Sequence, residues 1–180
     1  SSGGLAPLSE GMSFMDLVWD NLIPNSGYIY EILELFKKNK FLGVIAPPIP
    51  FMGSYFASLV GDEWTVCFNE TKKLAEKLGV RISISEEKLP FVLSTCFWCR
   101  QEALEELFRY SWREEDFPQE PLKLDGTVNH AIERILPYLA QRRGYYSAVA
   151  YQAEYASIYL NNLSYVVDEV FLELKKSNLT

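Results

Sequence analysis

The stretch DGTVNHAIERILPYLAQRRGYYSAVA, residues 125–150, decides how the fold is assigned. Its first three residues form a turn that opens a helix, and this helix is predicted to run to about Arg143. Gly144 follows as a helix-ending glycine, while Pro137 inside the helix is expected to kink it. The last six residues, 145–150, predict a short strand. A helix followed directly by a strand indicates mixed α and β structure.

Other predicted elements extend in both directions from this stretch. Residues 28–39 carry apolar side chains at helical spacing, with Ser26 as the expected N-cap. An apolar run at 43–46 predicts a buried strand. The remaining elements are a helix at 62–78 closed by Gly79, strands at 80–84 and 92–98, a helix at 101–110, a loop at 111–124 held by Trp112 and Phe117, and a long amphipathic final helix ending near Lys175. Inward positions expected on the final helix are Tyr155, Ile158, Tyr159, Leu163, Val166, Val167, Val170 and Phe171.

The order of these elements predicts a helix-rich α/β fold with a short, incomplete sheet. We expect residues 1–26 to form a leader and N-terminal arm, and residues 27–180 to form one α/β domain. The predicted strands are too few and too short for a complete doubly wound sheet. The domain is therefore expected to be a fragment of a larger protein.

Composition narrows the class of protein. A chain of 180 residues is about one domain long, and its formal net charge of −7 is spread out without a basic stripe. This charge argues against nucleic acid as a partner. No apolar run is long enough to predict a membrane span. Three cysteines lack the density of a disulfide scaffold, which favours a reduced, cytoplasmic setting.

Cys96 and Cys99 form a C-x-x-C spacing. A redox motif of this kind lies at a turn from a strand into a helix, where the helix start stabilises the first thiolate. Here Cys96 falls inside a predicted strand, and a zinc site would find only Cys67 and His130 as further ligands. The spacing is therefore interpreted as packing, with a thiol-disulfide protein kept as an alternative.

A more specific group of polar residues lies at the start of the helix predicted from residue 125. His130, Glu133 and Arg134 share one helix face because they are three and four residues apart. Asp125 lies at the helix start, where the helix dipole favours an ionised carboxylate, and such a carboxylate beside a loop suits a general base. The alternative is a capped helix with a surface charge network. The acidic run that includes Asp116, taken alone, is typical of a solvated turn.

Several pieces of sequence around this group agree in order with one known family. The pieces are Leu42-Gly43 with Pro47-Pro48, Phe97-Trp98-Cys99-Arg100 through Ala103-Leu104, Asp116-Phe117-Pro118 with Glu120-Pro121, Asp125-Gly126-Thr127, His130-Ala131-Ile132-Glu133-Arg134, Pro137-Tyr138-Leu139-Ala140-Gln141 and Gly144-Tyr145-Tyr146. Together they resemble the rhamnan synthesis protein F family of glycosyltransferases, which assemble rhamnose-containing cell-wall polysaccharides and lipopolysaccharide O-chains. The resemblance covers roughly residues 28–162.

This resemblance implies a fold, substrates and a place of action. The implied fold is GT-A, of which this chain would be the acceptor-side, C-terminal part. The implied donor is a nucleotide sugar such as dTDP-rhamnose, with Mg²⁺ or Mn²⁺ as a divalent metal. A growing polysaccharide or lipid-linked glycan is the implied acceptor, and other polysaccharide-assembly enzymes are implied partners. The protein would act in the cytoplasm, peripherally at the inner face of the cell membrane.

The resemblance also suggests roles for single residues. Asp125 would be the general base, and His130 would bind the metal or the leaving phosphate. Arg134 would either neutralise charge on the diphosphate or form a salt bridge with Glu133 or Asp125. Substrate-binding positions are expected at Trp112, Asp116, Phe117, Glu120 and Glu133. Of these, the aromatic pair would stack on the acceptor sugar or fix the loop, and Glu120 or Asp116 would be the next candidates for the base.

The sequence departs from the GT-A pattern in one respect. It has neither a convincing Asp-x-Asp element nor a glycine-rich phosphate loop. The donor-binding half is therefore expected upstream of Ser1. A different class of function stays open: a non-catalytic module that binds a glycan or a partner enzyme. Such a module would leave Asp125 and His130 exposed and apart, whereas an enzyme would bring them together.

Overall fold

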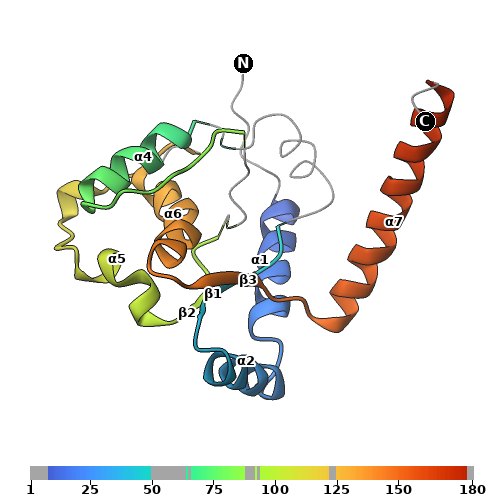
Figure 1. The fold of residues 1–180 in the computed structure, drawn as a ribbon, viewed down its shortest axis with the longest axis horizontal. Helices are drawn as coiled ribbons and strands as arrows, with labels where there is room; N and C mark the ends of the chain where they lie inside the picture. Colours follow the sequence, from blue (N-terminus) through green and yellow to red (C-terminus); the bar gives the residue numbers. More distant parts are fainter. Residues whose placement is uncertain are drawn as a thin grey trace. The chain divides into compact units, whose positions relative to one another are not determined.

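The computed structural model describes residues 8–49, 64, 66–87, 92, 94–121 and 125–177. They fall into two compact units, one ending at Ala150 and the other beginning at Tyr151. The helices are α1 (Leu8–Leu22), α2 (Ser26–Lys38), α4 (Phe68–Lys77), α5 (Glu105–Arg109), α6 (Val128–Arg142) and α7 (Ala153–Lys176), and the strands are β1 (Leu42–Ala46), β2 (Trp98–Cys99) and β3 (Tyr146–Val149) (Figure 1). Two short 3-10 helices, η1 (Gln101–Leu104) and η2 (Glu114–Asp116), lie between them.

The described strands form a small mixed sheet with β1 in the centre. The strand order is β2-β1-β3, with β2 antiparallel and β3 parallel to β1. All five residues of β1 are buried, which explains why its sequence is a continuous apolar run. The expected helix-rich α/β class and short sheet are confirmed, while the GT-A assignment stays a prediction.

A bulge in β1 assigns its side chains to the two faces of the sheet. The register with β3 shifts between Leu42 and Val44, so Gly43 is the extra residue. Val44 and Ala46 consequently face one apolar cluster, whereas Leu42 and Ile45 face another although they are three residues apart. The strand thereby supplies apolar side chains to both layers of helices.

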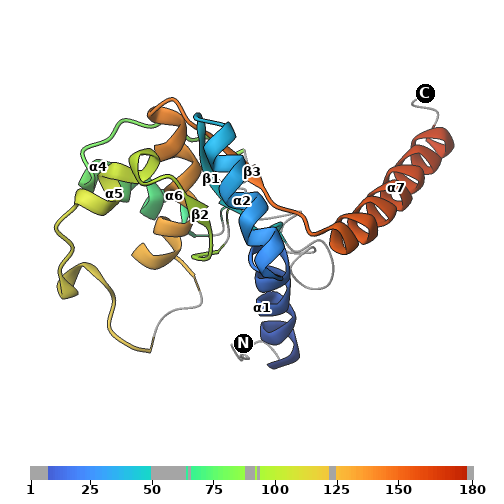
Figure 2. The ribbon, with the colours of Figure 1, turned by 90° about the horizontal axis from the view of Figure 1, so that it is seen from below.

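The two layers lie on opposite faces of the sheet (Figure 2). The larger cluster includes Leu74 of α4, Leu107 of α5 and the buried face of α6. The smaller one combines Val18 and Leu22 of α1 with Ile32 of α2. Helix α6 is the best buried of the helices in the described part of the chain, and its first turn carries the residues predicted to form the site.

Gly43 marks the closest approach between β1 and its neighbours, which yields a stability prediction. A Cβ at this position would lie 2.6 Å from the Tyr145 Cβ and 2.9 Å from the Ala103 Cβ. Gly43→Ala is therefore expected to lower the free energy of unfolding by about 1–3 kcal/mol through overpacking. Thermal unfolding measures this, with Gly27→Ala in α2 as the control, since its Cβ would meet only the Asn25 side-chain oxygen. Equal melting temperatures for the two variants would contradict the prediction.

Several elements agree with the sequence-based predictions. Helices α2 and α6, the turn of helix at 101–109, and strands β1 and β3 lie within one or two residues of their expected bounds. Gly79 and Gly144 end their helices with φ of 67° and 84°. The N-cap of α2 was assigned wrongly: Ser26 is the first helical residue, and the Oδ1 of Asn25 accepts from the Tyr28 backbone N–H at 3.0 Å.

The predicted strands at 80–84 and 92–98 are wrong in the described residues. Residues 80–85 have no strand pairing, and only Trp98 of the second segment lies in a strand. Ser94 accepts a hydrogen bond from the Cys96 backbone N–H at 3.0 Å, a local turn that competes with pairing. The helix predicted at 62–78 begins only at Phe68, because a turn from Trp64 to Cys67 precedes it; residues 62, 63 and 65 lie outside the described residues.

The second unit consists of α7 and its flanking residues. Tyr151, Tyr155 and Tyr159 stack on one another along its first turns, with ring centroids 5.4–6.3 Å apart. No side chain of α7 is buried, and Ile158 and Leu163, which the sequence predicted to point inward, are exposed. The division expected from the sequence, 1–26 and 27–180, stays a prediction.

Candidate functional site

The candidate site is built on the turn that leads into α6. Gly126 has a φ of 76°, a conformation that favours glycine, and a Cβ there would lie 2.6 Å from the Val66 Cγ2. This tight turn places Asp125 beside the first turns of the helix. Thr127 is the N-cap residue and is buried, and its backbone oxygen accepts from the Ala131 N–H at 3.0 Å.

Arg134 is the buried centre of the site. It is 6% exposed, and its Nη2 donates to Asp125 Oδ2 at 3.2 Å while its Nη1 donates to the His130 backbone oxygen at 3.1 Å. Because a buried guanidinium needs an opposite charge, this ion pair holds the Asp125 carboxylate in one place. The sequence brought Arg134 and Asp125 to the same end of the helix, and the structure makes them an ion pair.

His130 adds a second polar contact to this pair. The Thr127 hydroxyl lies 2.8 Å from His130 Nδ1, and Asp125 Oδ1 lies 3.8 Å from the same nitrogen. Thr127 makes no side-chain cap to the helix backbone, since its hydroxyl is used for this contact with the imidazole. Asp125 and His130 are thus brought together, each with about a fifth of its side chain exposed.

Two buried atoms of the site lack a hydrogen-bond partner in the described part of the chain: Asp125 Oδ1 and Arg134 Nε. An unpaired buried donor or acceptor costs about 1–3 kcal/mol. These two atoms, one acceptor and one donor, belong to side chains that contact each other. Such a pair suits a site that receives a polar ligand.

Glu133 and Cys67 lie in the same electrostatic environment. Burial raises the pKa of Glu133 above its ordinary value of 4.5, with Arg134 opposing this effect and Asp125 adding to it. Burial also raises the pKa of the Cys67 thiol, again with both charges of the ion pair acting on it. A carboxyl group that takes up a proton more readily is a candidate general base.

The raised pKa of Glu133 gives a stability prediction. Because the folded state disfavours the ionised carboxylate, its stability falls as pH rises above the unfolded pKa and through the folded one. Glu133→Gln is therefore expected to raise the melting temperature at neutral pH and to leave it unchanged near pH ~4. Thermal unfolding across this range measures the effect. Glu115→Gln, an exposed carboxylate in η2, is the control; a lower melting temperature for Glu133→Gln at neutral pH would contradict the prediction.

Trp112, Asp116 and Phe117 form a separate cluster, at the other end of α4. The Lys77 ammonium lies 2.5 Å from Asp116 Oδ1 and 5.7 Å from the Trp112 ring centroid. Trp112 packs on Phe117 with centroids 5.3 Å apart and donates from Nε1 to the Leu107 oxygen at 3.0 Å. The hydrogen bonds that the Lys77 ammonium and the Arg113 backbone N–H donate to Asp116 hold the pKa of its carboxyl below the ordinary value. As the sequence suggested, these aromatics fix the loop.

Helix α4 separates the two clusters. Its start lies beside the ion pair, since the charges of Arg134 and Asp125 act on Cys67, and its last residue is Lys77. Ten helical residues span about 15 Å. The structure therefore brings together Asp125, His130, Glu133 and Arg134, while Trp112, Asp116 and Phe117 lie a helix length away. Glu120 is exposed in the loop between.

The residues at this site do not fit a divalent metal. His130 and Asp125 are two candidate ligands, but Arg134 already supplies a positive charge to the carboxylate. Within the described ranges there is no group of three or more His, Cys, Asp or Glu side chains that could hold a metal ion. The metal role of His130 stays a prediction, and no step is derived from it.

The C-x-x-C cysteines have no redox geometry of the expected kind. Cys96 precedes β2 and Cys99 lies within it, so the pair does not open a helix, and both are free thiols. Burial raises the pKa of the Cys99 thiol, the second cysteine of the pair. These observations favour the packing interpretation.

Comparison with known proteins assigns the chain to a family. The model of the rhamnan synthesis protein F family matches residues 5–145, which is well over half of the chain. The chain belongs to the rhamnan synthesis protein F family. Searches of the curated proteins and of the solved structures returned no match. The resemblance predicted from the sequence is thereby confirmed, and membership connects the protein with rhamnan synthesis and so with polysaccharide biosynthesis.

The matched region of the rhamnan synthesis protein F family contains both clusters described above and ends before α7. None of the helices in the described part of the chain is long and apolar enough to cross a membrane. Sequence reasoning missed Thr127 and Cys67 as members of the site. Thr127 was visible only as the third residue of the Asp-Gly-Thr turn, and Cys67 gave no local signal because its place depends on how α4 packs against α6.

Proposed function

We propose that this chain is the acceptor-side part of an inverting glycosyltransferase that moves rhamnose from a nucleotide-diphosphate donor to a growing cell-surface glycan. The proposal rests on family membership together with one observation: Asp125, His130 and Arg134 converge at the start of α6. The proposed donor is a nucleotide sugar such as dTDP-rhamnose, and the proposed acceptor is a lipid-linked glycan. The proposed place of action is the cytoplasmic face of the membrane, where such an acceptor is extended.

Asp125 is the proposed general base. Its carboxylate takes the proton of an acceptor hydroxyl, the hydroxyl oxygen bonds to the anomeric carbon, and the bond from that carbon to the diphosphate breaks with its electron pair leaving on the phosphate. Base catalysis of this kind contributes about 10²–10⁴ in rate. Arg134 is the proposed positioning residue, since it is buried against the carboxylate. Glu133, whose pKa burial raises, is the second candidate for the base.

A glycan- or partner-binding module is the second candidate function. It requires no convergence of acidic and basic side chains, and it would be expected to leave Asp125 and His130 apart and exposed. The 3.8 Å distance between their side chains and their partial burial support the enzyme instead. The aromatic content of the chain fits both functions and does not decide between them.

A transfer assay separates these functions. The intact protein is incubated with dTDP-rhamnose and a lipid-linked oligosaccharide, and mass spectrometry follows the acceptor. An enzyme gives a product that is one or more rhamnose residues heavier, and NMR of the new linkage reports inversion at the anomeric carbon. A binding module retains the oligosaccharide and leaves its mass unchanged, an outcome that would overturn the proposal.

A further inference from the structure

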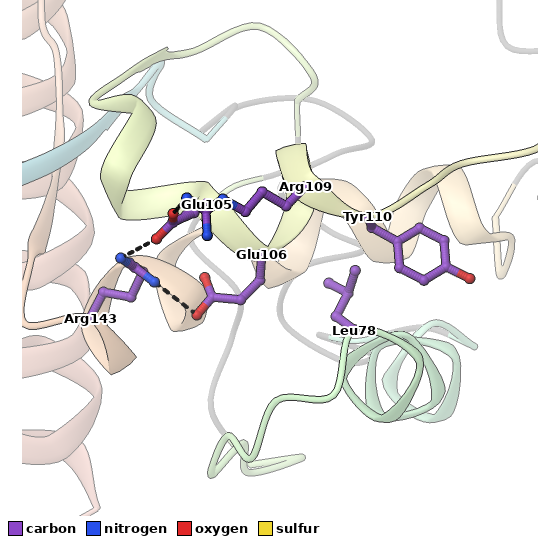
Figure 3. A pocket seen from close by; sticks show the side chains of 6 residues that line it. All are labelled: Leu78, Glu105, Glu106, Arg109, Tyr110 and Arg143. Atoms are coloured by element: carbon purple, nitrogen blue, oxygen red, sulfur yellow. Dashed lines mark hydrogen bonds and ion pairs between the residues drawn. The ribbon is translucent and has the colours of Figure 1, made fainter.

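A small pocket lies away from the Asp125 site, at the ends of three helices. Its volume is about 300 Å³, and its lining residues are Leu78, Glu105, Glu106, Arg109, Tyr110 and Arg143 (Figure 3). Leu78, Tyr110 and Arg143 are the C-cap residues of α4, α5 and α6. The 15 residues of α6 span about 22 Å, so the pocket and Asp125 lie at opposite ends of that helix.

The electrostatics of the pocket disfavour an anionic ligand. Helix C-termini carry partial negative charge, and the longer helices α4 and α6 both end here. Glu105 and Glu106 add two carboxylates to the wall. These negative charges offset the arginines that pair with them, so the pocket has no excess positive charge with which to bind a nucleotide diphosphate.

The same wall disfavours a cation because its carboxylates are already paired. Arg109 pairs with Glu105 at 2.5 Å, and Arg143 bridges Glu105 and Glu106, with 3.3 Å from its Nη1 to Glu106 Oε1 (Figure 3). Arg142, outside the lining, also pairs with Glu106 at 2.5 Å, so two carboxylates meet three guanidinium groups, and the partial negative charge of the helix C-termini offsets the excess. Glu106 Oε2 is a buried acceptor with no hydrogen-bond partner in the described residues. The paired groups leave fixed hydrogen-bond donors and acceptors side by side, which is what a ligand with several hydroxyl groups requires.

Apolar surface completes the pocket. Leu78 supplies an aliphatic wall and Tyr110 an aromatic one. Tyr110 also continues into the aromatic cluster of the neighbouring loop, since its ring lies 4.8 Å from that of Trp112, and Trp112 contacts Phe117, which is 37% exposed. The aromatic residues predicted from the sequence to contact the acceptor thus lie beside this pocket and not beside Asp125.

We propose that this pocket binds one neutral sugar residue of the acceptor glycan, a helix length away from the reacting hydroxyl. Its volume lies at the small end of ligand sites and suits a single sugar ring better than a nucleotide sugar. Binding at this distance holds the glycan through a residue that does not react. The inference rests on the proposed function for the identity of the glycan, while the preference for a neutral polyhydroxyl ligand rests on the pocket.

The test is an NMR titration of the intact protein with methyl α-L-rhamnoside, with thymidine diphosphate as the anionic comparison. We expect the rhamnoside to shift the amide signals of Leu78, Glu105, Arg109 and Tyr110, and thymidine diphosphate to leave them unchanged. Arg109→Ala should weaken rhamnoside binding about tenfold, the loss of one charged hydrogen-bond donor. The fold should tolerate this change because the Arg109 side chain is 79% exposed.

Arg113→Ala is the matched control, since the Arg113 side chain is 73% exposed and pairs with Glu115 outside the pocket. It should leave the affinity within about twofold, a difference that corresponds to less than 0.5 kcal/mol. The inference fails if rhamnoside shifts no pocket signal, if thymidine diphosphate shifts the same ones, or if both arginine variants bind alike. If rhamnoside binds in this pocket but the wild-type protein transfers no sugar, only the proposed function fails. If the protein transfers sugar but rhamnoside shifts signals outside the pocket, only this inference fails.

Discussion

Replacing Asp125 with asparagine is expected to lower the rate of rhamnose transfer by about 10²–10⁴-fold, the contribution of a positioned general base. The amide retains the size of the carboxylate, and its oxygen can still accept the hydrogen bond from Arg134. It cannot take a proton from the acceptor hydroxyl. The effect should therefore fall on kcat, while binding of the nucleotide-sugar donor stays intact.

The measurement is the transfer assay with intact protein, accompanied by donor binding and thermal unfolding of the variant. Glu115→Gln is the control because this carboxylate is exposed in η2, and it should retain full activity. If Asp125→Asn still turns over at the wild-type rate, the base is another residue. Glu133 would be examined first, because it lies in the same cluster and its pKa is raised. Asp116 and Glu120 lie outside this cluster, in the loop that precedes α6.

Replacing Arg134 with methionine is expected to cost about 3–5 kcal/mol of folding free energy. Arg134 is 6% exposed, and its removal leaves the Asp125 carboxylate partly buried without its opposite charge. The hydrogen bond to the His130 backbone oxygen is lost as well. Urea denaturation of wild type and variant measures the difference.

A double variant distinguishes this mechanism from a simple packing defect. Adding Asp125→Leu to Arg134→Met removes the stranded charge, so most of the lost stability should return. Arg113→Met, in an exposed ion pair, should change stability by less than about 0.5 kcal/mol. If the double variant is no more stable than Arg134→Met, the ion pair is not the source of the loss.

Most helices were predictable because their signals are local, whereas α1 (Leu8–Leu22) was not predicted from the sequence. Periodic apolar residues, Asp-Gly-Thr at the start and Gly144 at the end defined α6 almost to the residue. The strands were harder, since a strand exists only where a partner lies beside it. Ser94 bends its segment through one side-chain hydrogen bond, and only Trp98–Cys99 pairs with β1. Hydrophobic alternation could not reveal either fact.

The candidate site was predictable to the extent that it lies on one helix. The spacing of His130, Glu133 and Arg134 predicted a shared face, and Asp125 at the helix start completed the cluster. The place of Trp112 and Asp116 could not be predicted in this way. It depends on the contact of Asp116 with Lys77 at the far end of α4, a pairing between residues 39 positions apart.

The glycine in the centre of β1 has a mechanical consequence for the site. Gly43 meets Ala103 of η1 and Ala140 of α6, where three small residues let a helix rest almost directly on the backbone of the strand. Ala140 lies ten residues beyond His130, so this contact is about 15 Å along the helix from the imidazole. A side chain at position 43 that displaces α6 from the strand would also displace Arg134 and His130, which lie nearer the start of the same helix. Variation at Gly43 should therefore disturb the geometry of the candidate site as well as stability.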